Sequence, residues 1–359
     1  MDFHKRLRRL DEILAEKGLD GALLLCPENV FYMTGAPFIA GSPDTLLYLK
    51  RGGAASLIVW SRDYEETAEK VKCAELERLA VGEKPIDRLR KVLGSDKRVG
   101  FEEGYMSLNS YKGFGKFMDL VPLEGSVEKM RQVKDAEEVA VIEKAQGITD
   151  RAFAKAIGRL KEGMTELEAA SELEYFLRRE GGSSYSFDTI VASGHRAVYP
   201  HGMPGDKRAQ GGEAVIFDCG VRVDGYCSDM TRTIFFGKPR GEIMKIYSAV
   251  RLAQEGAIAA AKPGVSGREL DAVARKIIGD LGYAKFFVHG LGHGVGLAIH
   301  EGPFVSALSQ DIIVEGNIVT DEPGIYISGL GAVRIEDMLL ITERGCRDLT
   351  KSYKEITIV

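Results

Sequence analysis

The sequence lacks the features that mark several protein classes. Its five cysteines are odd in number and show no C-x-x-C spacing, which favours a reducing, cytoplasmic setting over a disulfide framework. No uninterrupted apolar run approaches the roughly 20 residues that a transmembrane helix requires. The formal net charge of −5 gives no electrostatic reason to expect binding to nucleic acid or to an anionic membrane. The stretch MDFHKRLRRLDEILAEKGL mixes charges with leucine and isoleucine at helical spacing, so we do not interpret it as a signal peptide.

Two domains are expected, because 359 residues exceed what one hydrophobic core usually supports. Residues 1–125 alternate helical and strand-like patterns, with a helix over residues 3–17, an apolar run GALLLC and the hairpin pattern TLLYLK-RGG-AASLIVW. This order predicts a small α/β domain. The domain contains no phosphate-binding loop, no G-x-S-x-G and no metal-ligand spacing. We therefore expect it to be structural, to mediate oligomerisation, or to wall a substrate site.

A change of composition over residues 125–138 marks the start of a second, α+β domain, residues 126–359. Asp135 is suited to cap a long helix, because its short polar side chain satisfies free amides of the first turn. Helical stretches are expected over residues 137–160 and 240–261.

An internal repeat organises this second domain. The segment KEGMTELE, after the first helical stretch, is echoed by KPGVSGRE after the second. Each segment contains a capping box, formed by Thr165 with Glu168 and by Ser266 with Glu269. The repeat predicts two halves that face each other across a sheet, with a pseudo-twofold relation and a site between them.

Two aspartates occur in one predicted hairpin, AVIFDCGVRV-DG-YCSDMTRTIFF. Its Asp-Gly pair is a strong two-residue turn signal, which places Asp218 opposite Thr231 and makes Asp229 a diagonal neighbour of Asp218, roughly 7–8 Å away or less. Two carboxylates in an apolar hairpin repel each other unless a cation lies between them. The alternatives are that both aspartates face water, or that one pairs with Arg222 or Arg232.

A second acidic pair, Glu322 and Glu336, flanks a glycine-rich turn in DEPGIYISGLGAVRIEDMLLI. A loop of three or five residues would place the two glutamates opposite each other, and the sequence leaves this register open. They could form a solvated pair, but the apolar residues around them indicate substantial burial.

Three of the six histidines lie in the stretch HGLGHGVGLAIHE. His289 and His293 have the i, i+4 spacing of zinc ligands on a helix, but each glycine costs a helix about 1 kcal/mol, so we expect an extended or looped segment. On a regular strand His300 would point away from the other two, unless a glycine bulge resets the alternation. Any one of them, considered alone, is better interpreted as a hydrogen-bonded loop residue. The G-x-G-x-G pattern lacks the strand-to-helix context of a dinucleotide loop.

These residues together predict an oxygen-rich metal site with four carboxylates and few imidazoles. Such a mixture suits divalent manganese, cobalt, iron or zinc better than it suits a structural thiolate zinc site. Four carboxylates exceed the charge of one divalent ion, so we expect two ions with bridging carboxylates.

The ordered motifs FDCG, SDMTRT, GHGVGL, DEPGIY and RIED resemble those of the metallopeptidase family of Xaa-Pro dipeptidases (prolidases) and aminopeptidase P. This family has the pita-bread fold of creatinase and methionine aminopeptidase. The segment VASGHRAVYPHG also resembles the family's sequence ahead of the first aspartate, and the first ~125 residues resemble its creatinase-type N-terminal domain. The resemblance spans essentially the full chain, and the internal repeat matches the pseudo-twofold symmetry of the fold.

The resemblance implies a homodimeric enzyme that hydrolyses peptides with proline in the second position. It implies that a hydroxide held between two divalent ions attacks the scissile carbonyl, while Glu322 carries the proton to the leaving nitrogen. Asp229 and Glu336 would bridge the ions, Asp218 would bind one, and His293 with Glu322 the other. The five ligands implied are therefore Asp218, Asp229, His293, Glu322 and Glu336.

Further residues match the motifs of the family around the site. The resemblance implies that three histidines bind the substrate carbonyl or oxyanion and line the proline pocket: His201, His289 and His300. Tyr326 and Arg334 match positions next to the ligands or the substrate.

Three positions depart from the family pattern. Many members have H-E-x-P-R, in which the arginine is associated with the terminal carboxylate of the substrate, whereas this chain has HEGPF with Phe304. Ala298 and Tyr199 stand where glutamate and leucine are common. The choice between dipeptides and longer peptides stays open, unless Arg196 or a cation of a partner chain replaces the missing arginine.

The second interpretation is a related enzyme of the same fold. Methionine aminopeptidase shares the ligands but typically lacks the N-terminal domain, whereas creatinase has the domain without a metal-binding set. The third alternative is a pita-bread binding module without activity, but such modules lose ligands and this chain has all five.

Overall fold

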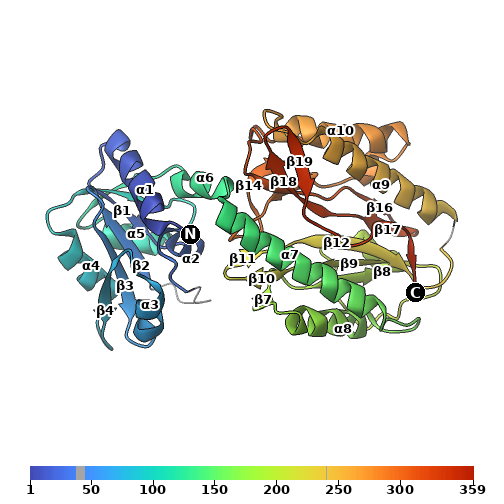
Figure 1. The fold of residues 1–359 in the computed structure, drawn as a ribbon, viewed down its shortest axis with the longest axis horizontal. Coiled ribbons are helices and arrows are strands. Elements are labelled where there is room, and N and C mark those ends of the chain that lie inside the picture. The colour runs from blue at the N-terminus through green and yellow to red at the C-terminus, as the bar shows by residue number, and fades with distance from the viewer. Residues whose placement is uncertain (38–44, 240) are drawn as a thin grey trace. The chain divides into compact units, whose positions relative to one another are not determined.

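The computed structural model describes residues 1–37, 45–239 and 241–359, which form two compact units, Met1–Arg131 and Gln132–Val359 (Figure 1). Within the described residues, no helix is both long enough and apolar enough to cross a membrane. An α/β unit is followed by an α+β unit with an internal repeat, so the fold class predicted from the sequence is confirmed.

Unit 1 is built on a six-stranded sheet in the order β4-β3-β2-β1-β5-β6. Its strands are β1 Gly21–Leu24, β2 Leu46–Lys50, β3 Ala55–Trp60, β4 Glu75–Leu79, β5 Arg98–Phe101 and β6 Asp119–Pro122. The helices are α1 Phe3–Lys17, α2 Pro27–Thr34, α3 Tyr64–Lys70, α4 Pro85–Leu93 and α5 Leu108–Phe114; α6 Ser126–Gln132 spans the unit boundary.

Local signals in the sequence account for much of unit 1. The helix predicted over residues 3–17 is α1, which begins with Asp2 accepting the amide of Lys5 and ends at Gly18 in the left-handed conformation. β2 and β3 form the predicted antiparallel hairpin around the glycine turn. The apolar segment NVFYMT lies in α2, which starts on Pro27.

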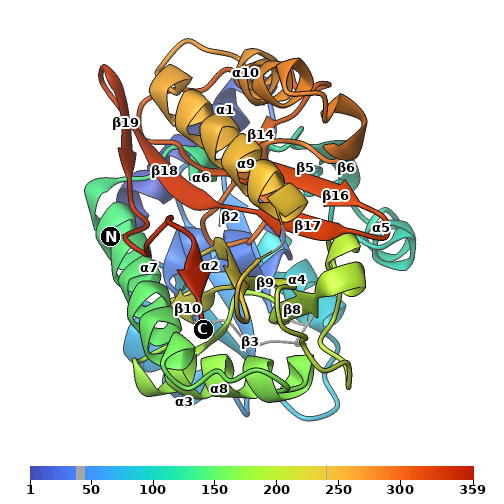
Figure 2. The same cartoon turned by 90° about the vertical axis from the view of Figure 1, so that its right-hand side faces the viewer.

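Unit 2 contains two helix pairs with strands between them (Figures 1 and 2). One pair is α7 Ala136–Ile157 with α8 Glu166–Arg179, and the other is α9 Gly241–Ala260 with α10 Gly267–Asp280. Residue 240, where the second helical stretch was expected to start, lies outside the described residues. α8 and α10 both begin with a complete capping box, as the repeat predicts. Asp135 forms a third capping box at the start of α7.

Two larger sheets lie at the centre of unit 2, in the orders β20-β12-β9-β8 and β14-β13-β15-β18-β19, and the smaller sheets are β11-β10-β7 and β16-β17. The pairings within these sheets are antiparallel, except that β20 runs parallel to β12. Strands of the first half are β7 Ser184–Tyr185, β8 Ile190–Ser193, β9 Ala214–Cys219, β10 Val221–Val223, β11 Tyr226–Cys227 and β12 Met230–Phe235. Those of the second half are β13 Gly292–Gly294, β14 Glu301–Val305, β15 Ile318–Asp321, β16 Gly324–Ile327, β17 Gly331–Arg334, β18 Asp337–Thr342, β19 Gly345–Asp348 and β20 Thr357–Ile358. Short 3-10 helices lie at Gly194–Val198 and Ala284–Phe286.

Glu102, directly after β5, is a buried carboxyl of unit 1, with 4% of its surface exposed. It accepts hydrogen bonds from the amides of Leu25 (2.6 Å) and Cys26 (2.8 Å) and from the side-chain amide of Asn29 (2.6 Å). Burial raises the pKa of Glu102 to about 7, because the loss of hydration outweighs these three bonds.

The stability of unit 1 is therefore expected to fall as the pH rises from about 4.5 to about 7. The folded state binds the Glu102 proton more tightly than the unfolded state, so raising the pH through this window costs up to about 3 kcal/mol. Trp60, the one tryptophan of the chain, lies in β3 of the same sheet, so its fluorescence during urea unfolding measures the effect. Glu102→Gln is the control, because it removes the titration. If the free energy of unfolding changed with pH by the same amount in the wild type and in Glu102→Gln over this window, the raised pKa of Glu102 would be refuted.

Candidate metal centre

The hairpin that carries the two aspartates has the predicted register. Thr231 pairs with Asp218 in β9 and β12, and the same register continues between β10 and β11 up to the two-residue turn. Asp224 and Gly225 form this turn with φ angles of 46° and 87°, as an Asp-Gly hairpin requires. Both Asp218 and Asp229 are buried, so they are not a solvated pair.

The arginines offered as alternative partners of the aspartates bind elsewhere. Arg232 forms an ion pair of 2.8 Å with Asp337 and donates to the backbone oxygen of Glu336 at 2.7 Å. Arg222 donates to the backbone oxygens of Gly225 and Leu297. The cation beside Asp218 is instead Arg334, whose Nη2 lies 2.6 Å from Oδ2 of Asp218.

Glu322 and Glu336 lie in a break between two strand pairs. Asp321 pairs with Asp337 on one side of the break, and Gly324 pairs with Arg334 on the other. Because both pairs share one register, the glutamates face each other across the break, as a three-residue loop predicts. Glu336 is 1% exposed and the Glu322 side chain 18% exposed, which confirms the expected burial.

The glycine-rich histidine segment is not helical. It contains the short strand β13 and the first residue of β14, and the pairing of these strands shifts register between Gly292 and Gly294, an irregularity of the kind that a glycine bulge produces. Glycine is required at 292 and 294, because an added Cβ would lie 2.1 Å and 2.2 Å from backbone oxygens of neighbouring strands. As a result, His289, His293 and His300 line the same cavity.

This cavity has a volume of about 490 Å³ and lies within unit 2. All five residues implied as ligands line it, and so do the three further histidines and Arg334. Tyr326 lies behind the cavity wall, where it binds His289 and Arg334. The remaining lining residues are Phe187, Asp188, Ile190, Pro200, Met203, Gly290, Gly292, Ile299, Phe304 and Ser306.

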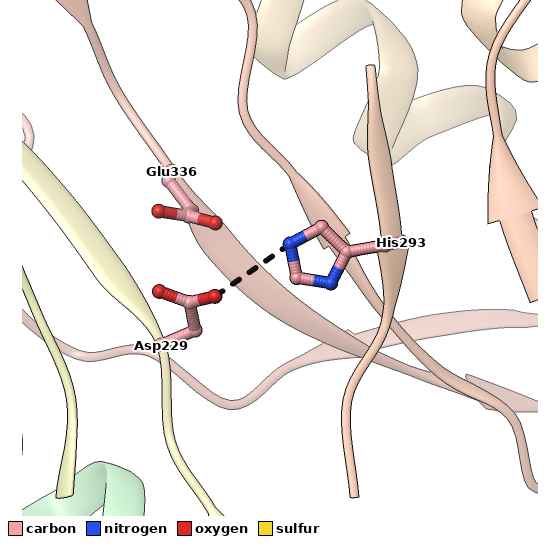
Figure 3. A group of neighbouring side chains, drawn as sticks. All are labelled: Asp229, His293 and Glu336. Carbon is pink, nitrogen blue, oxygen red and sulfur yellow. Dashed lines mark ion pairs between the residues drawn. The ribbon is translucent and has the colours of Figure 1, made fainter. Parts of the chain in front are cut away.

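Asp229, His293 and Glu336 form the centre of the site, with one ligand atom of each within 4.8 Å of the others (Figure 3). Nε2 of His293 lies 3.7 Å from Oδ2 of Asp229 and 3.4 Å from Oε1 of Glu322. Nδ1 of His293 is 3.1 Å from the backbone oxygen of Gly294. Because that oxygen only accepts, Nδ1 carries the proton and the lone pair of Nε2 faces the carboxylates.

The electrostatics of the site call for a cation. Burial, followed by the charge of Glu336, raises the pKa of Asp229 well above its usual range, and burial with Glu322 does the same to the pKa of Glu336. Burial also raises the pKa of Asp218, although Arg334 opposes the shift. Oδ1 of Asp218 is buried and, within the described part of the chain, has no hydrogen-bond partner. Buried carboxylate oxygen atoms that repel one another, beside an unprotonated imidazole nitrogen, form a set of donors that fits divalent metal ions.

Two threonines orient the side chains expected to be ligands, and the sequence patterns did not single out either threonine. Thr231 donates to Oε2 of Glu336 at 2.8 Å, and Thr320 donates to Oε1 of Glu322 at 3.3 Å while accepting the amide of His293 at 3.0 Å. Such partners fix the direction of a ligand's lone pairs. The predicted register already placed Thr231 opposite Asp218, so its proximity could have been inferred from the sequence.

A hydrogen-bonded chain connects the other motif residues. Nε2 of His289 lies 2.8 Å from the Tyr326 hydroxyl, which accepts a bond of 2.9 Å from Arg334. Nδ1 of His289 is 2.8 Å from the backbone oxygen of Gly290, so Nε2 accepts the tyrosine proton. On α10, Arg275 donates to the backbone oxygens of Phe287 and His289, which fixes this loop from outside the cavity.

The chain matches known families over almost its whole length. Residues 140–343 match metallopeptidase family M24, and residues 6–133 match the creatinase/prolidase N-terminal domain. The chain is 38% identical to an Xaa-Pro dipeptidase of Pyrococcus furiosus over 354 residues, 98% of this chain and 99% of that protein.

Solved structures agree with these matches. An Xaa-Pro dipeptidase from Bacillus anthracis superposes with a TM-score of 0.94 at 35% identity, covering 100% of both chains. An X-Pro aminopeptidase from Thermotoga maritima gives 0.89 at 34% identity, covering 99% of this chain and 100% of that one. The predicted pita-bread fold and N-terminal domain are confirmed.

Proposed function

The chain belongs to metallopeptidase family M24, and from this premise we propose that it cleaves the bond between the first residue of a peptide and a proline in the second position. It is a metal-dependent hydrolase. The observation that carries the proposal is the convergence of four buried carboxylates and one imidazole in a cavity, in a chain 38% identical to an Xaa-Pro dipeptidase. The peptide would bind with its first peptide bond beside these groups.

Two divalent ions, of manganese, cobalt, iron or zinc, would be held by Asp218, Asp229, His293, Glu322 and Glu336. When bound, they supply a Lewis acid for the scissile carbonyl and lower the pKa of water toward neutrality. The burial of the carboxylates and the bare Oδ1 of Asp218 support this set. Arg334, which is paired with Oδ2 of Asp218, holds that carboxylate in place.

Further residues act on the peptide itself. The Glu322 carboxylate takes a proton from the attacking water and passes it to the leaving proline nitrogen. His201 and His300 line the cavity and would donate hydrogen bonds to the carbonyl oxygen as negative charge develops on it. His289 would act together with Tyr326, to which it is bonded. Phe187, Ile190 and Ile299 offer an apolar wall that suits a proline ring.

Hydrolysis of three peptides tests the proposed function. With Mn²⁺ or Co²⁺ added we expect cleavage of Ala-Pro-Ala, little cleavage of Met-Ala-Ser, and loss of activity in EDTA. Preferential cleavage of Met-Ala-Ser would indicate a methionine aminopeptidase. An absence of metal-dependent cleavage of Ala-Pro-Ala and Ala-Pro would refute the proposal and favour a binding module.

We also propose that residues 126–359 are the catalytic domain, and that the enzyme works as a homodimer in the cytoplasm. The first proposal is supported by the location of every cavity residue in that range. All five cysteines are free, which supports a reducing compartment. The homodimer rests on the family resemblance alone.

A further inference from the structure

We propose that this cavity takes peptides that continue beyond the proline in preference to free dipeptides. This inference rests on the proposed function, because it concerns the group that comes after proline in the same site. In a dipeptide that group is a carboxylate, whereas in a longer peptide it is a neutral amide. This carboxylate or amide is attached to the proline, one residue from the scissile bond, so it would lie in the cavity or at its rim.

The described residues that line the cavity offer few positive charges. Asp188 joins Asp218, Asp229, Glu322 and Glu336 as a fifth acidic residue. Among the described lining residues, Arg334 is the one arginine, and there is no lysine. Divalent ions would be balanced by the four carboxylates that hold them. A carboxylate that enters without a cationic partner loses hydration and gains no compensating ion pair.

Arg334 is already fully engaged. Its side chain is 3% exposed, and it donates to Asp218 at 2.6 Å, to the Tyr326 hydroxyl at 2.9 Å and to the Thr231 hydroxyl at 3.1 Å. A fourth bond, of 3.3 Å, goes to the backbone oxygen of Pro200. To bind a substrate carboxylate, Arg334 would have to leave Asp218, and a buried carboxylate would lose its partner.

The other candidate cations among the described residues of this chain do not provide a substitute. Both ring nitrogens of His289 are already hydrogen-bonded, to the backbone oxygen of Gly290 and to the Tyr326 hydroxyl, and the ring of His300 packs against that of His293 with 4.3 Å between the ring centroids. His201 can donate one hydrogen bond but not the two-point pairing of a guanidinium. Arg196, considered from the sequence, does not line the cavity and is bonded to Glu166 at 2.9 Å and to the backbone oxygen of Met203 at 2.6 Å.

Phe304 is placed to contact the part of a peptide beyond the proline. It lies on β14, lines the cavity and is 50% exposed, while its backbone amide is held by Asp311 at 2.8 Å. Met203, another lining residue, is 49% exposed. These exposed apolar side chains at the rim suit a continuing peptide chain better than a terminal charge. Phe304 is therefore a specificity-determining residue of the site.

The test compares Ala-Pro, Ala-Pro-NH₂ and Ala-Pro-Ala with the Mn²⁺-loaded enzyme. We expect kcat/KM for the amide and the tripeptide to exceed that for Ala-Pro by about tenfold or more, because only Ala-Pro presents a carboxylate there. Ala-Pro-NH₂ has the length of a dipeptide, so it separates charge from length. A kcat/KM for Ala-Pro equal to or above that for the amide would overturn the inference while leaving the proposed function intact. Cleavage of none of the three would overturn both.

Phe304→Arg provides a second, independent test. A guanidinium at the rim is expected to raise kcat/KM for Ala-Pro about tenfold without raising that for Ala-Pro-NH₂. Phe304→Leu, which adds no charge, is the matched control and should keep the wild-type ratio of the two substrates. Equal effects of Phe304→Arg on both substrates would contradict the role of charge. The wild-type comparison stands by itself if this variant does not fold.

Discussion

Asp229→Asn is expected to abolish metal binding and to lower hydrolysis of Ala-Pro-Ala by about 10³-fold or more. The carboxylate lies at the centre of the site, with Oδ2 3.7 Å from Nε2 of His293, and asparagine replaces its charge with a neutral amide. Loss of metal chemistry removes several kcal/mol of transition-state stabilisation, which corresponds to that factor. Metal analysis after gel filtration and initial rates measure the two effects.

Two controls separate this effect from unfolding. Asp224→Asn changes an exposed aspartate in the turn of the same hairpin, whose side chain is 70% exposed, and should retain metal and activity. Metal-free Asp229→Asn should be no less stable than the metal-free wild type, because burial and the nearby Glu336 already disfavour the ionised carboxylate that asparagine removes. Retention of wild-type metal content by Asp229→Asn would contradict the assigned site.

Replacing each of the three histidines of HGLGHGVGLAIHE by alanine is expected to have two different effects, loss of metal or loss of turnover. His293→Ala should lose metal, because Nε2 of His293 faces Asp229 and Glu322. His289→Ala and His300→Ala should keep metal but lose turnover by about 10²- to 10³-fold, because the role proposed for these two histidines is to act on the substrate. Metal content and kcat, measured on the same preparations, distinguish the two classes.

His4→Ala is the control for this series, because His4 lies in α1 of unit 1 and is exposed. It should change neither metal content nor kcat. Equal loss of metal from His289→Ala, His293→Ala and His300→Ala would show that the segment is a three-histidine metal site, contrary to the division proposed.

Local rules predict much of this fold and part of its site. The Asp-Gly turn fixes the pairing of β9 with β12, so the position of Asp218 opposite Thr231 follows from the sequence. Capping boxes likewise mark the starts of α8 and α10, because they depend on residues three positions apart. The glycines after His289 also exclude a helix for purely local reasons.

Contacts between segments that are distant in the sequence could not be predicted from these local rules. The pairing of Arg334 with Asp218 joins strands 116 positions apart, and sequence patterns suggested Arg222 or Arg232 instead. Arg275 on α10 supports the loop of His289 through backbone oxygens, which leave no residue-type signal in the loop itself. Tertiary packing decides such partners, and the sequence pattern constrains only which residues are available.

The most direct test is a titration of metal-free wild-type protein with Mn²⁺, in which bound metal and hydrolysis of Ala-Pro-Ala are measured in the same samples. We expect two ions per chain to bind, and activity to appear only as they bind. Full hydrolysis of Ala-Pro-Ala in the metal-free protein, or activity that rises without bound metal, would contradict the assignment of Asp218, Asp229, His293, Glu322 and Glu336 as the catalytic metal centre.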